Sequence, residues 1–230
     1  EELEKRKLEI DIAGVPHTFG FGGLHGAREN FVYSGKMMII DVSSFYPTLM
    51  INNGFVSRAS REPELFKQIY HERLRLKELK DPKQEVYKIV LNATFGASKS
   101  EFNPLYDPRQ ANNICVNGQL ILTHLILSIE PFCQLIQSNT DGIIISYEND
   151  DMRDIILEGL DTFEKYYNLS FDVEYIKKIA QRDVNNYVIQ YEDGKIEAKG
   201  RFANFDGGNF ERNNLHIIDK ALVNHYIYNI

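Results

Sequence analysis

The chain has 230 residues, of which 43% are hydrophobic and 26% are charged, so it can bury a core as one large domain or two small ones. Its net charge of −7 argues mildly against a nucleic-acid partner, although a local basic stripe can coexist with acidic faces. No apolar run approaches the length of a membrane span and no signal peptide opens the chain, so the sequence predicts no membrane partner.

The first part of the chain is expected to form strands around a glycine-rich segment. Residues 1 to 12 end in an alternating pattern that predicts a strand. Val15–Ala27 is rich in glycine, which is typical either of an ordinary turn or of backbone that approaches a ligand closely. Arg28–Gly35 is expected to be a loop or an edge strand, and the apolar run Met37–Ile40 a buried strand.

Two helices with a short connection are predicted next. Pro63–Lys80 is strongly helical, and Pro82 breaks the helix after it. An approximate apolar face on this helix is formed by Leu65, Ile69, Leu76 and Leu79. The second helix is expected from about Gln84 to Thr94, with Gly96 as a stop signal. The short connection predicts an antiparallel helical hairpin.

The remainder alternates between helices and strands. The predicted elements are a buried helix over Ala111–Glu130, a strand hairpin over Phe132–Gln137 and Ile143–Tyr147, an amphipathic helix over Met152–Tyr167, and strands over Phe171–Ile179, Asn186–Tyr191 and Lys195–Gly200. A glycine loop and a helix are expected over residues 206–230. This order predicts an α+β fold with an antiparallel sheet.

Two aspartates lie at the ends of apolar strand-like runs. Asp41 follows Met37–Ile40, where it either caps the next helix or acts as a ligand, because an unpaired carboxylate at a core edge is unfavourable. Asp141 lies in SNTDG, which by itself is also good turn chemistry. If the two strands are neighbours, the carboxylates converge, and such a pair binds Mg²⁺ when substrate phosphates complete its coordination.

Polar side chains recur at i, i+4 spacing on the predicted helical hairpin. They are Arg73 and Lys77 on the first helix and Lys88 and Asn92 on the second. Such a face suits a triphosphate. The alternative is a solvated face on which Glu72 and Glu78 neutralise the first pair. That alternative is weaker for Lys88, because its helix is otherwise apolar.

Three segments, in order, resemble the motifs of family B DNA polymerases. DVSSFYP at Asp41–Pro47 resembles motif A, D-x-x-S-L-Y-P, and KIVLNATFG at Lys88–Gly96 resembles motif B, K-x-x-x-N-x-x-Y-G, with Phe for the usual Tyr. SNTDG at Ser138–Gly142 resembles motif C, D-T-D, with Asn139 in place of the first aspartate and Gly142 in place of the usual Ser. The resemblance covers about residues 15 to 205.

This resemblance implies a right-hand polymerase fold with an antiparallel-sheet palm and helical-hairpin fingers. The implied parts are palm over 1–57, fingers over 58–98, palm again over 99–205, and the start of a thumb or a C-terminal helix over 206–230. The chain is thus expected to be a palm-and-fingers fragment or a minimal polymerase of phage or mobile-element type.

The resemblance also implies residue roles. Asp41 and Asp141 are similar to the catalytic metal ligands, with the backbone of Val42 as a further ligand for Mg²⁺ or Mn²⁺. The implied nucleotide-binding residues are Tyr46, under the incoming sugar, and Arg73, Lys77, Lys88 and Asn92. The implied DNA-binding residues are Gly22, Gly23, Tyr187 and Lys199.

The expected function is template-directed transfer of deoxynucleotides to a primer 3′-hydroxyl on primer–template DNA. Asn139 removes a negative charge from the hairpin and favours a second hypothesis, a polymerase-like module that grips primer–template without catalysis. A third is a Mg²⁺-dependent nuclease that uses the same aspartates, against which the triphosphate-binding row argues.

Cellular context follows from the cysteines. Cys115 and Cys133 form no CxxC pair and lie in apolar surroundings, so we expect reduced thiols in a cytoplasmic protein, in the host cytoplasm if it is phage-encoded. We also expect a monomer.

Overall fold

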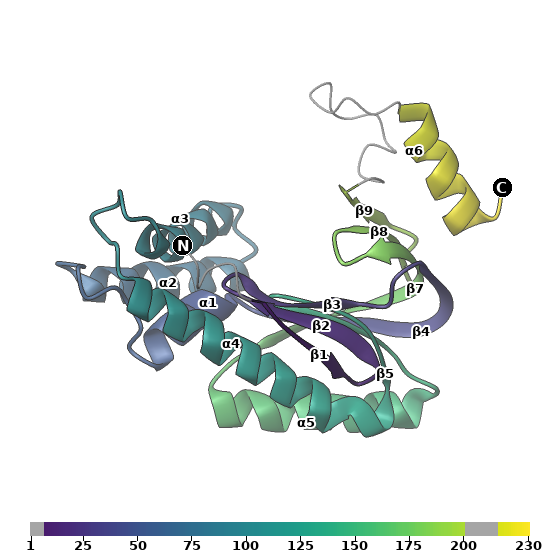
Figure 1. Cartoon of the computed structure of the whole chain (residues 1–230), viewed down its shortest axis with the longest axis horizontal. Helices are drawn as coiled ribbons and strands as arrows, with labels where there is room; N and C mark the ends of the chain where they lie inside the picture. The colour runs from purple at the N-terminus through teal and green to yellow at the C-terminus, as the bar shows by residue number, and fades with distance from the viewer. Residues whose placement is uncertain (1–6, 201–215) are drawn as a thin grey trace.

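The computed structural model describes residues 7–200 and 216–230 (Figure 1). Its strands are β1 Leu8–Ile12, β2 Val15–Gly20, β3 Gly23–Ala27, β4 Phe31–Val42, β5 Gln134–Asn139, β6 Gly142–Ser146, β7 Phe171–Asp183, β8 Asn186–Tyr191 and β9 Ile196–Lys199. Its helices are α1 Phe45–Asn52, α2 Pro63–Glu78, α3 Gln84–Lys99, α4 Pro108–Ile129, α5 Asp150–Tyr167 and α6 His216–Val223. A 3-10 turn, η1 Glu130–Phe132, follows α4, and a π-helical turn, η3 Asn224–Tyr228, follows α6.

One nine-stranded sheet organises the described residues. Its strand order is β1-β2-β3-β5-β6-β4-β7-β8-β9, and every neighbouring pair is antiparallel. The predicted α+β class with an antiparallel sheet is therefore confirmed. The expectation of a loop or edge strand over Arg28–Gly35 is wrong, because β4 begins at Phe31 and runs through the middle of the sheet between β6 and β7.

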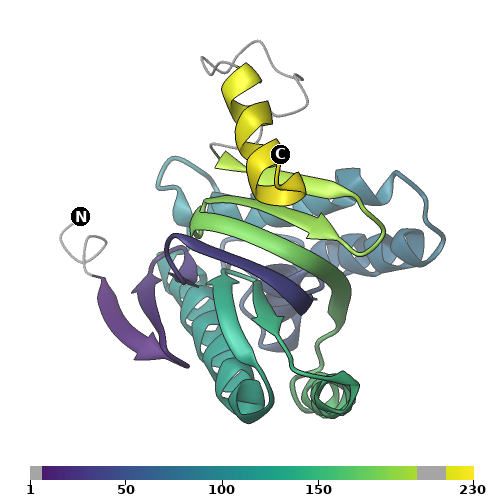
Figure 2. The same ribbon diagram turned by 90° about the vertical axis from the view of Figure 1, so that its right-hand side faces the viewer.

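Helices cover one face of this sheet, where α4 and α5 lie side by side in both views (Figure 2). Successive side chains of a strand point to opposite faces. Met38 and Ile40 of β4 therefore join α4 and α5 in the main core, whereas Met37 and Ile39 belong to a second cluster made of strand residues alone. Asp41 has the same phase as Met37 and Ile39, so its side chain belongs to the face that α4 and α5 do not cover.

The glycine-rich segment forms a strand hairpin. β2 and β3 pair from His17↔Gly26 to Gly20↔Gly23, and Phe21 and Gly22 form the turn between them. At the end of this turn Gly23 has φ +147, and a Cβ there would lie 3.0 Å from Thr140 Oγ1. Glycine thus allows the β2–β3 turn to approach the turn between β5 and β6.

The helices α2 and α3 form the predicted hairpin, with two corrections. α3 continues through Gly96 to Lys99, because Leu91 and Ser98 are buried and tertiary packing overrides the weak helix propensity of one glycine. The apolar face of α2 is rotated from the predicted one. Leu65 and Leu79 are exposed, and the buried residues are Phe66, Arg73 and Leu76.

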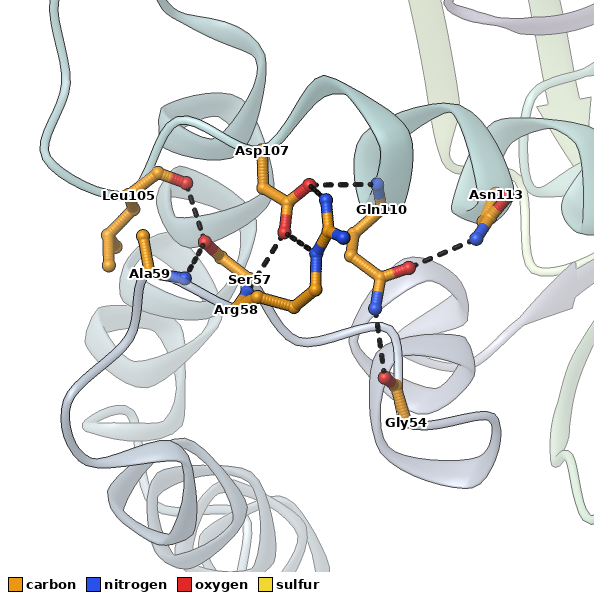
Figure 3. A network of polar contacts seen from close by, with 8 residues as sticks. All are labelled: Gly54, Ser57, Arg58, Ala59, Leu105, Asp107, Gln110 and Asn113. Atoms are coloured by element: carbon orange, nitrogen blue, oxygen red, sulfur yellow. Dashed lines mark hydrogen bonds and ion pairs between the residues drawn. The ribbon is translucent and has the colours of Figure 1, made fainter.

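The long helix α4 begins at Pro108, three residues before the predicted start. The Asp107 side chain caps it by accepting a hydrogen bond from the Gln110 N–H, and Pro108 occupies the first helical position. Asp107 also binds the Arg58 guanidinium at 2.7 Å, which ties the loop after α1 to the start of α4 (Figure 3).

The expectation that no segment approaches the length of a membrane span is wrong for α4, judged by length and composition. The 25 residues Pro108–Phe132 are long and apolar enough to cross a membrane, and 44% of that apolar stretch is buried inside the protein. Its buried side chains, including Ile114, Leu122 and Ile126, pack into the main core. The core helix of a soluble protein has the same composition.

The C-terminal helix packs against the far end of the sheet. Val223 of α6 and Ile227 of η3 form a small cluster with Ala180 and Val188 of β7 and β8. A helix was predicted here, whereas the predicted glycine loop at 206–215 lies outside the described residues.

Candidate active site

The strand that carries Asp41 and the strand that follows Asp141 are neighbours. Asp41 of β4 pairs directly with Gly142 of β6, and the Val42 N–H donates a hydrogen bond of 2.8 Å to the Asp141 carbonyl oxygen. The predicted condition for convergence is therefore met. Asp141 itself lies in the two-residue turn between β5 and β6, as its local sequence predicts.

Asp41 does not cap the following helix. The N-cap of α1 is Ser44, which adopts a left-handed conformation with φ 52, and α1 has no side-chain cap hydrogen bond. The capping alternative for Asp41 is therefore wrong. Its carboxylate lies instead against Gly142, where an added Cβ would clash with Asp41 Oδ1 and lie 2.9 Å from Asp41 Cγ.

Burial and neighbouring carboxylates raise the pKa of Asp41. Partial burial and then the negative charges of Asp141, Glu174 and Asp172 raise the pKa of Asp41 to about 7. Burial also raises the pKa of Asp141, while the positive charges of Lys88 and Lys199 act in the opposite direction. Excess negative charge of this kind favours a bound cation.

Asp141 borders a hollow of about 240 Å³ between the β5–β6 turn and helices α1, α2 and α3. Its lining includes four residues that the sequence assigned to nucleotide binding, namely Tyr46, Arg73, Lys88 and Asn92. The N-terminus of α1, at Ser44 and Phe45, opens into the same hollow. A helix N-terminus with two cations offers an anion-binding surface. We call this space the α1–α3 hollow.

Arg73 is 5% exposed, and its Nε and Nη1 atoms have no hydrogen-bond partner. Burial lowers the pKa of its guanidinium. The alternative of a solvated face neutralised by Glu72 and Glu78 is wrong for Arg73, because Glu72 binds Arg75 instead, at 2.7 Å. Burial of an unpaired guanidinium is unfavourable, and an anionic partner would offset that free-energy penalty.

Lys77 lies outside the α1–α3 hollow, unlike the other predicted triphosphate-binding residues Arg73, Lys88 and Asn92. Its Nζ lies 2.6 Å from Asp172 Oδ2 and 2.8 Å from Ser43 Oγ, and it does not line the α1–α3 hollow. Asp172 of β7 pairs directly with Asp41. Although burial acts the other way, hydrogen bonds from Lys77 and Ser43 hold the pKa of Asp172 below its ordinary value.

Sequence reasoning missed Asp172 and Glu174. Both belong to β7, opposite Asp41 and Ile39 respectively, so they share the face of the sheet on which Asp41 lies. The alternation of charged and apolar residues in FDVEYI was a usable signal, since it places both carboxylates on one face of a strand.

A second hollow of about 210 Å³ lies on the face of the sheet that α4 and α5 leave uncovered. It is lined by Asp41 and Asp141 together with the predicted DNA-binding residues Tyr187 and Lys199. Lys199 Nζ lies 5.8 Å from the centre of the Tyr187 ring. Asn139 lines this hollow as well. We call it the sheet hollow.

The other two predicted DNA-binding residues, Gly22 and Gly23, lie at the β2–β3 turn. The Tyr46 hydroxyl donates to the Gly22 carbonyl oxygen at 2.9 Å, so this turn contacts the α1–α3 hollow through Tyr46.

A resident metal would need ligands from outside the protein. Across residues 7–200 and 216–230, no three His, Cys, Asp or Glu side chains are grouped so that they could hold a metal ion. Two solvent-accessible carboxylates, Asp41 and Asp141, fit Mg²⁺ that takes its remaining ligands from water and substrate phosphates.

Known proteins resemble this chain in sequence and in fold. No family model matches the chain. Over 129 residues, 54% of the chain, it is 33% identical to DNA polymerase 1 of Sulfolobus acidocaldarius, and over 125 residues it is 27% identical to DNA polymerase 1 of Saccharolobus solfataricus. The structure of the family B DNA polymerase from the hyperthermophilic archaeon Pyrobaculum calidifontis superposes on 85% of the chain with a TM-score of 0.58 and 15% identity.

The chain is related in sequence to archaeal DNA polymerases. Its α+β fold matches part of such a polymerase, since the aligned region is 30% of the Pyrobaculum calidifontis chain. The chain spans 14% of the length of the curated relatives that it matches. The similarity in sequence extends over about half of the chain's own length.

Proposed function

We propose that this chain is the catalytic core of a template-directed DNA polymerase. In this proposal residues 1–57 and 99–205 form the palm, 58–98 form the fingers, and 206–230 begin the thumb or form a C-terminal helix. Primer–template DNA and deoxynucleoside triphosphates are the partners. We extend the proposal to a monomeric, phage-like protein that acts in the cytoplasm.

The observation that carries the proposal is the position of Asp141, which lines both hollows. A nucleotide in the α1–α3 hollow and a primer end in the sheet hollow would meet at this carboxylate. Asp41 adjoins it through the hydrogen bond between Val42 and Asp141. Transfer of a nucleotidyl group between two bound substrates requires that their reacting groups are held close together at one site.

Asp41, Asp141 and the backbone of Val42 would hold Mg²⁺, or Mn²⁺ in its place. When bound, the metal would activate the primer hydroxyl and offset the charge of the phosphates. The raised pKa values of both aspartates support this role, because proximity of a cation favours their ionised forms.

The remaining residues would bind and orient the nucleotide. Arg73, Lys88 and Asn92 would bind the triphosphate, with the unpaired guanidinium of Arg73 gaining the anionic partner that it lacks. Tyr46, which lines the same hollow, would lie under the sugar and exclude a 2′-hydroxyl. Lys77 would act indirectly, because it binds Asp172 and Ser43 beside Asp41.

On the other side of Asp141, Tyr187 and Lys199 would hold the primer strand in the sheet hollow. Gly22 and Gly23 would lie along the path of the DNA at the β2–β3 turn. Phosphate contacts from lysine position a duplex without reading its sequence.

One observation favours a second candidate, a module that binds primer–template without efficient turnover. Asn139 lines the sheet hollow at the position where the family motif has an aspartate, so the site carries one negative charge fewer. A weaker charge would lower metal affinity while leaving the DNA-binding surface unchanged.

Primer extension with Mg²⁺ or Mn²⁺ separates these functions. We expect wild type to extend a labelled primer and the Asp41→Ala variant to bind the same DNA without extending it. Asp150→Ala, which removes an exposed aspartate paired with Lys36, is the matched control and should extend normally. Binding without extension by wild type would support the second candidate, and strand cleavage would support a nuclease.

A further inference from the structure

The backbone of the β2–β3 turn is held by side chains from three helices. Its four consecutive carbonyl oxygens, from Gly20 to Gly23, each accept at least one side-chain hydrogen bond. The contacts are Gln119 Nε2 to Gly20 O (2.5 Å) and Gly23 O (3.1 Å), Lys99 Nζ and Cys115 Sγ to Phe21 O (2.5 and 3.2 Å), and Tyr46 Oη to Gly22 O (2.9 Å). A turn fixed at every carbonyl has little freedom to move.

Gln119 differs from the other donors because it contacts two carbonyl oxygens of the turn. Its side-chain amide donates to both ends of the turn, at the Gly20↔Gly23 pair that closes the hairpin. The residue is 9% exposed and extends from the buried face of α4. Without this amide, two carbonyl oxygens near the core would each lose a side-chain donor, which is unfavourable enough to move the turn.

The position of the β2–β3 turn also restrains the Tyr46 side chain. The Tyr46 ring lies 4.6 Å from the centre of the Phe95 ring and 5.8 Å from that of Phe45. On a third side it touches α4 at Gly118, where an added Cβ would lie 3.2 Å from Tyr46 Cε1. These contacts restrain the ring, and the Gly22 carbonyl oxygen restrains the hydroxyl.

We infer that Gln119 is a positioning residue that sets the place of Tyr46 at the floor of the α1–α3 hollow, and thereby the preference for deoxynucleotides over ribonucleotides. The inference rests on the proposed function. It follows from a chain of contacts in which Gln119 fixes the turn, the turn fixes the Tyr46 hydroxyl, and Tyr46 lines the hollow. Exclusion of one hydroxyl group requires placement to within a fraction of an ångström.

Gln119→Leu and Gln119→Glu test this inference together. Leucine removes the amide at similar volume, and glutamate keeps the size but replaces the donor with an oxygen. The matched control is Gln110→Leu, because Gln110 is also a glutamine of α4 whose amide donates to a glycine carbonyl, that of Gly54 at 3.3 Å (Figure 3). Neither Gln110 nor Gly54 lines the α1–α3 hollow. The readout is the ratio of kcat/KM for a deoxynucleotide to kcat/KM for the matching ribonucleotide.

We expect both Gln119 variants to lower this ratio by about tenfold, chiefly through easier use of the ribonucleotide, and Gln110→Leu to leave it unchanged. A merely structural role would lower both kcat/KM values alike, and circular dichroism melting identifies a variant that fails to fold. Calorimetric binding of dATP and ATP with Ca²⁺ reports the same preference without turnover.

The outcomes separate the inference from the proposed function. An unchanged ratio in folded Gln119 variants, while Tyr46→Ala loses discrimination, overturns this inference alone. A wild-type chain that neither incorporates nor binds nucleotides overturns both.

Discussion

The Asp41 carboxylate occupies the space in which a side chain of residue 142 would begin. An added Cβ at Gly142 would clash with Asp41 Oδ1 and lie 2.9 Å from Asp41 Cγ. The two residues are direct partners across β4 and β6. The glycine after Asp141 therefore determines where the neighbouring aspartate can lie.

Gly142→Ala should separate activity from stability. The new Cβ displaces chiefly the end of the Asp41 side chain and would lie 3.2 Å from the Ile40 carbonyl oxygen, while alanine suits a strand better than glycine, so we expect a change in unfolding free energy below about 1 kcal/mol. Because Asp41 moves, nucleotide incorporation should fall by about tenfold. Urea denaturation and primer extension measure the two effects.

Gly159→Ala is the control for this variant. Gly159 lies within α5 with no atom near its missing Cβ, so alanine should raise the unfolding free energy by about 1 kcal/mol and leave incorporation unchanged. Wild-type incorporation by Gly142→Ala would show that the Asp41 position described above is not used in the reaction.

Arg73→Met should stabilise the free protein and weaken nucleotide binding. Removal of a buried guanidinium with two unpartnered nitrogens should raise the unfolding free energy by about 1 kcal/mol. The same change should raise KM for deoxynucleotides by about tenfold or more, because a charge-assisted contact to the triphosphate is lost. Denaturation and steady-state kinetics provide both values.

Arg75→Met is the matched control on the same helix. Arg75 is exposed and bound to Glu72, so both stability and KM should change little. Loss of stability in Arg73→Met together with an unchanged KM would contradict the assigned role of Arg73.

The Asp107 cap should give stability a defined pH dependence. Hydrogen bonds from Arg58, and then from the backbone N–H groups of Arg58 and Gln110, hold the pKa of Asp107 well below its ordinary value despite burial. A depressed folded pKa gives stability that is complete above the unfolded pKa of about 4 and is lost as pH falls toward the folded value.

Asp107→Ala should therefore lower the unfolding free energy by about 2 kcal/mol at pH 7, and by less at pH 3, where the Asp107 carboxyl of the unfolded wild-type chain is largely protonated while that of the folded protein is still ionised. Urea denaturation at pH 7, 5 and 3 measures the difference. A difference that stays constant or grows down to pH 3 would refute this account of the cap.

Tyr46→Ala should admit ribonucleotides. Its ring lines the α1–α3 hollow between Phe95 and Gly118, and its removal opens space beside the sugar. We expect discrimination against ribonucleotides to fall by about 100-fold or more in competition assays. Unchanged discrimination would show that another residue excludes the 2′-hydroxyl.

Much of the site was predictable because short sequence patterns indicate its strands, turn and helix faces. The apolar run before Asp41 predicted a strand, and SNTDG predicted a turn, so two strand-end carboxylates were expected before any contact was known. The i, i+4 spacing of Lys88 and Asn92 correctly placed them on one side of α3.

The remaining features depend on contacts that sequence spacing does not encode. Asp172 lies 131 positions after Asp41 and meets it only through β4–β7 pairing. Arg73 is buried because the apolar face of α2 is rotated, and Gln119 reaches Gly20 across 99 positions. Local rules of helix and strand periodicity do not contain such long-range pairings.

The most direct test of polymerase function is the single-turnover rate at which a correct deoxynucleotide is added to a primer in Mg²⁺, compared between wild type and Asp141→Asn. Asp141 lines both hollows, so we expect wild type to extend the primer and the variant to be slower by about a thousandfold, while both bind the primer–template equally. Equal rates in the two proteins would contradict the central role of Asp141.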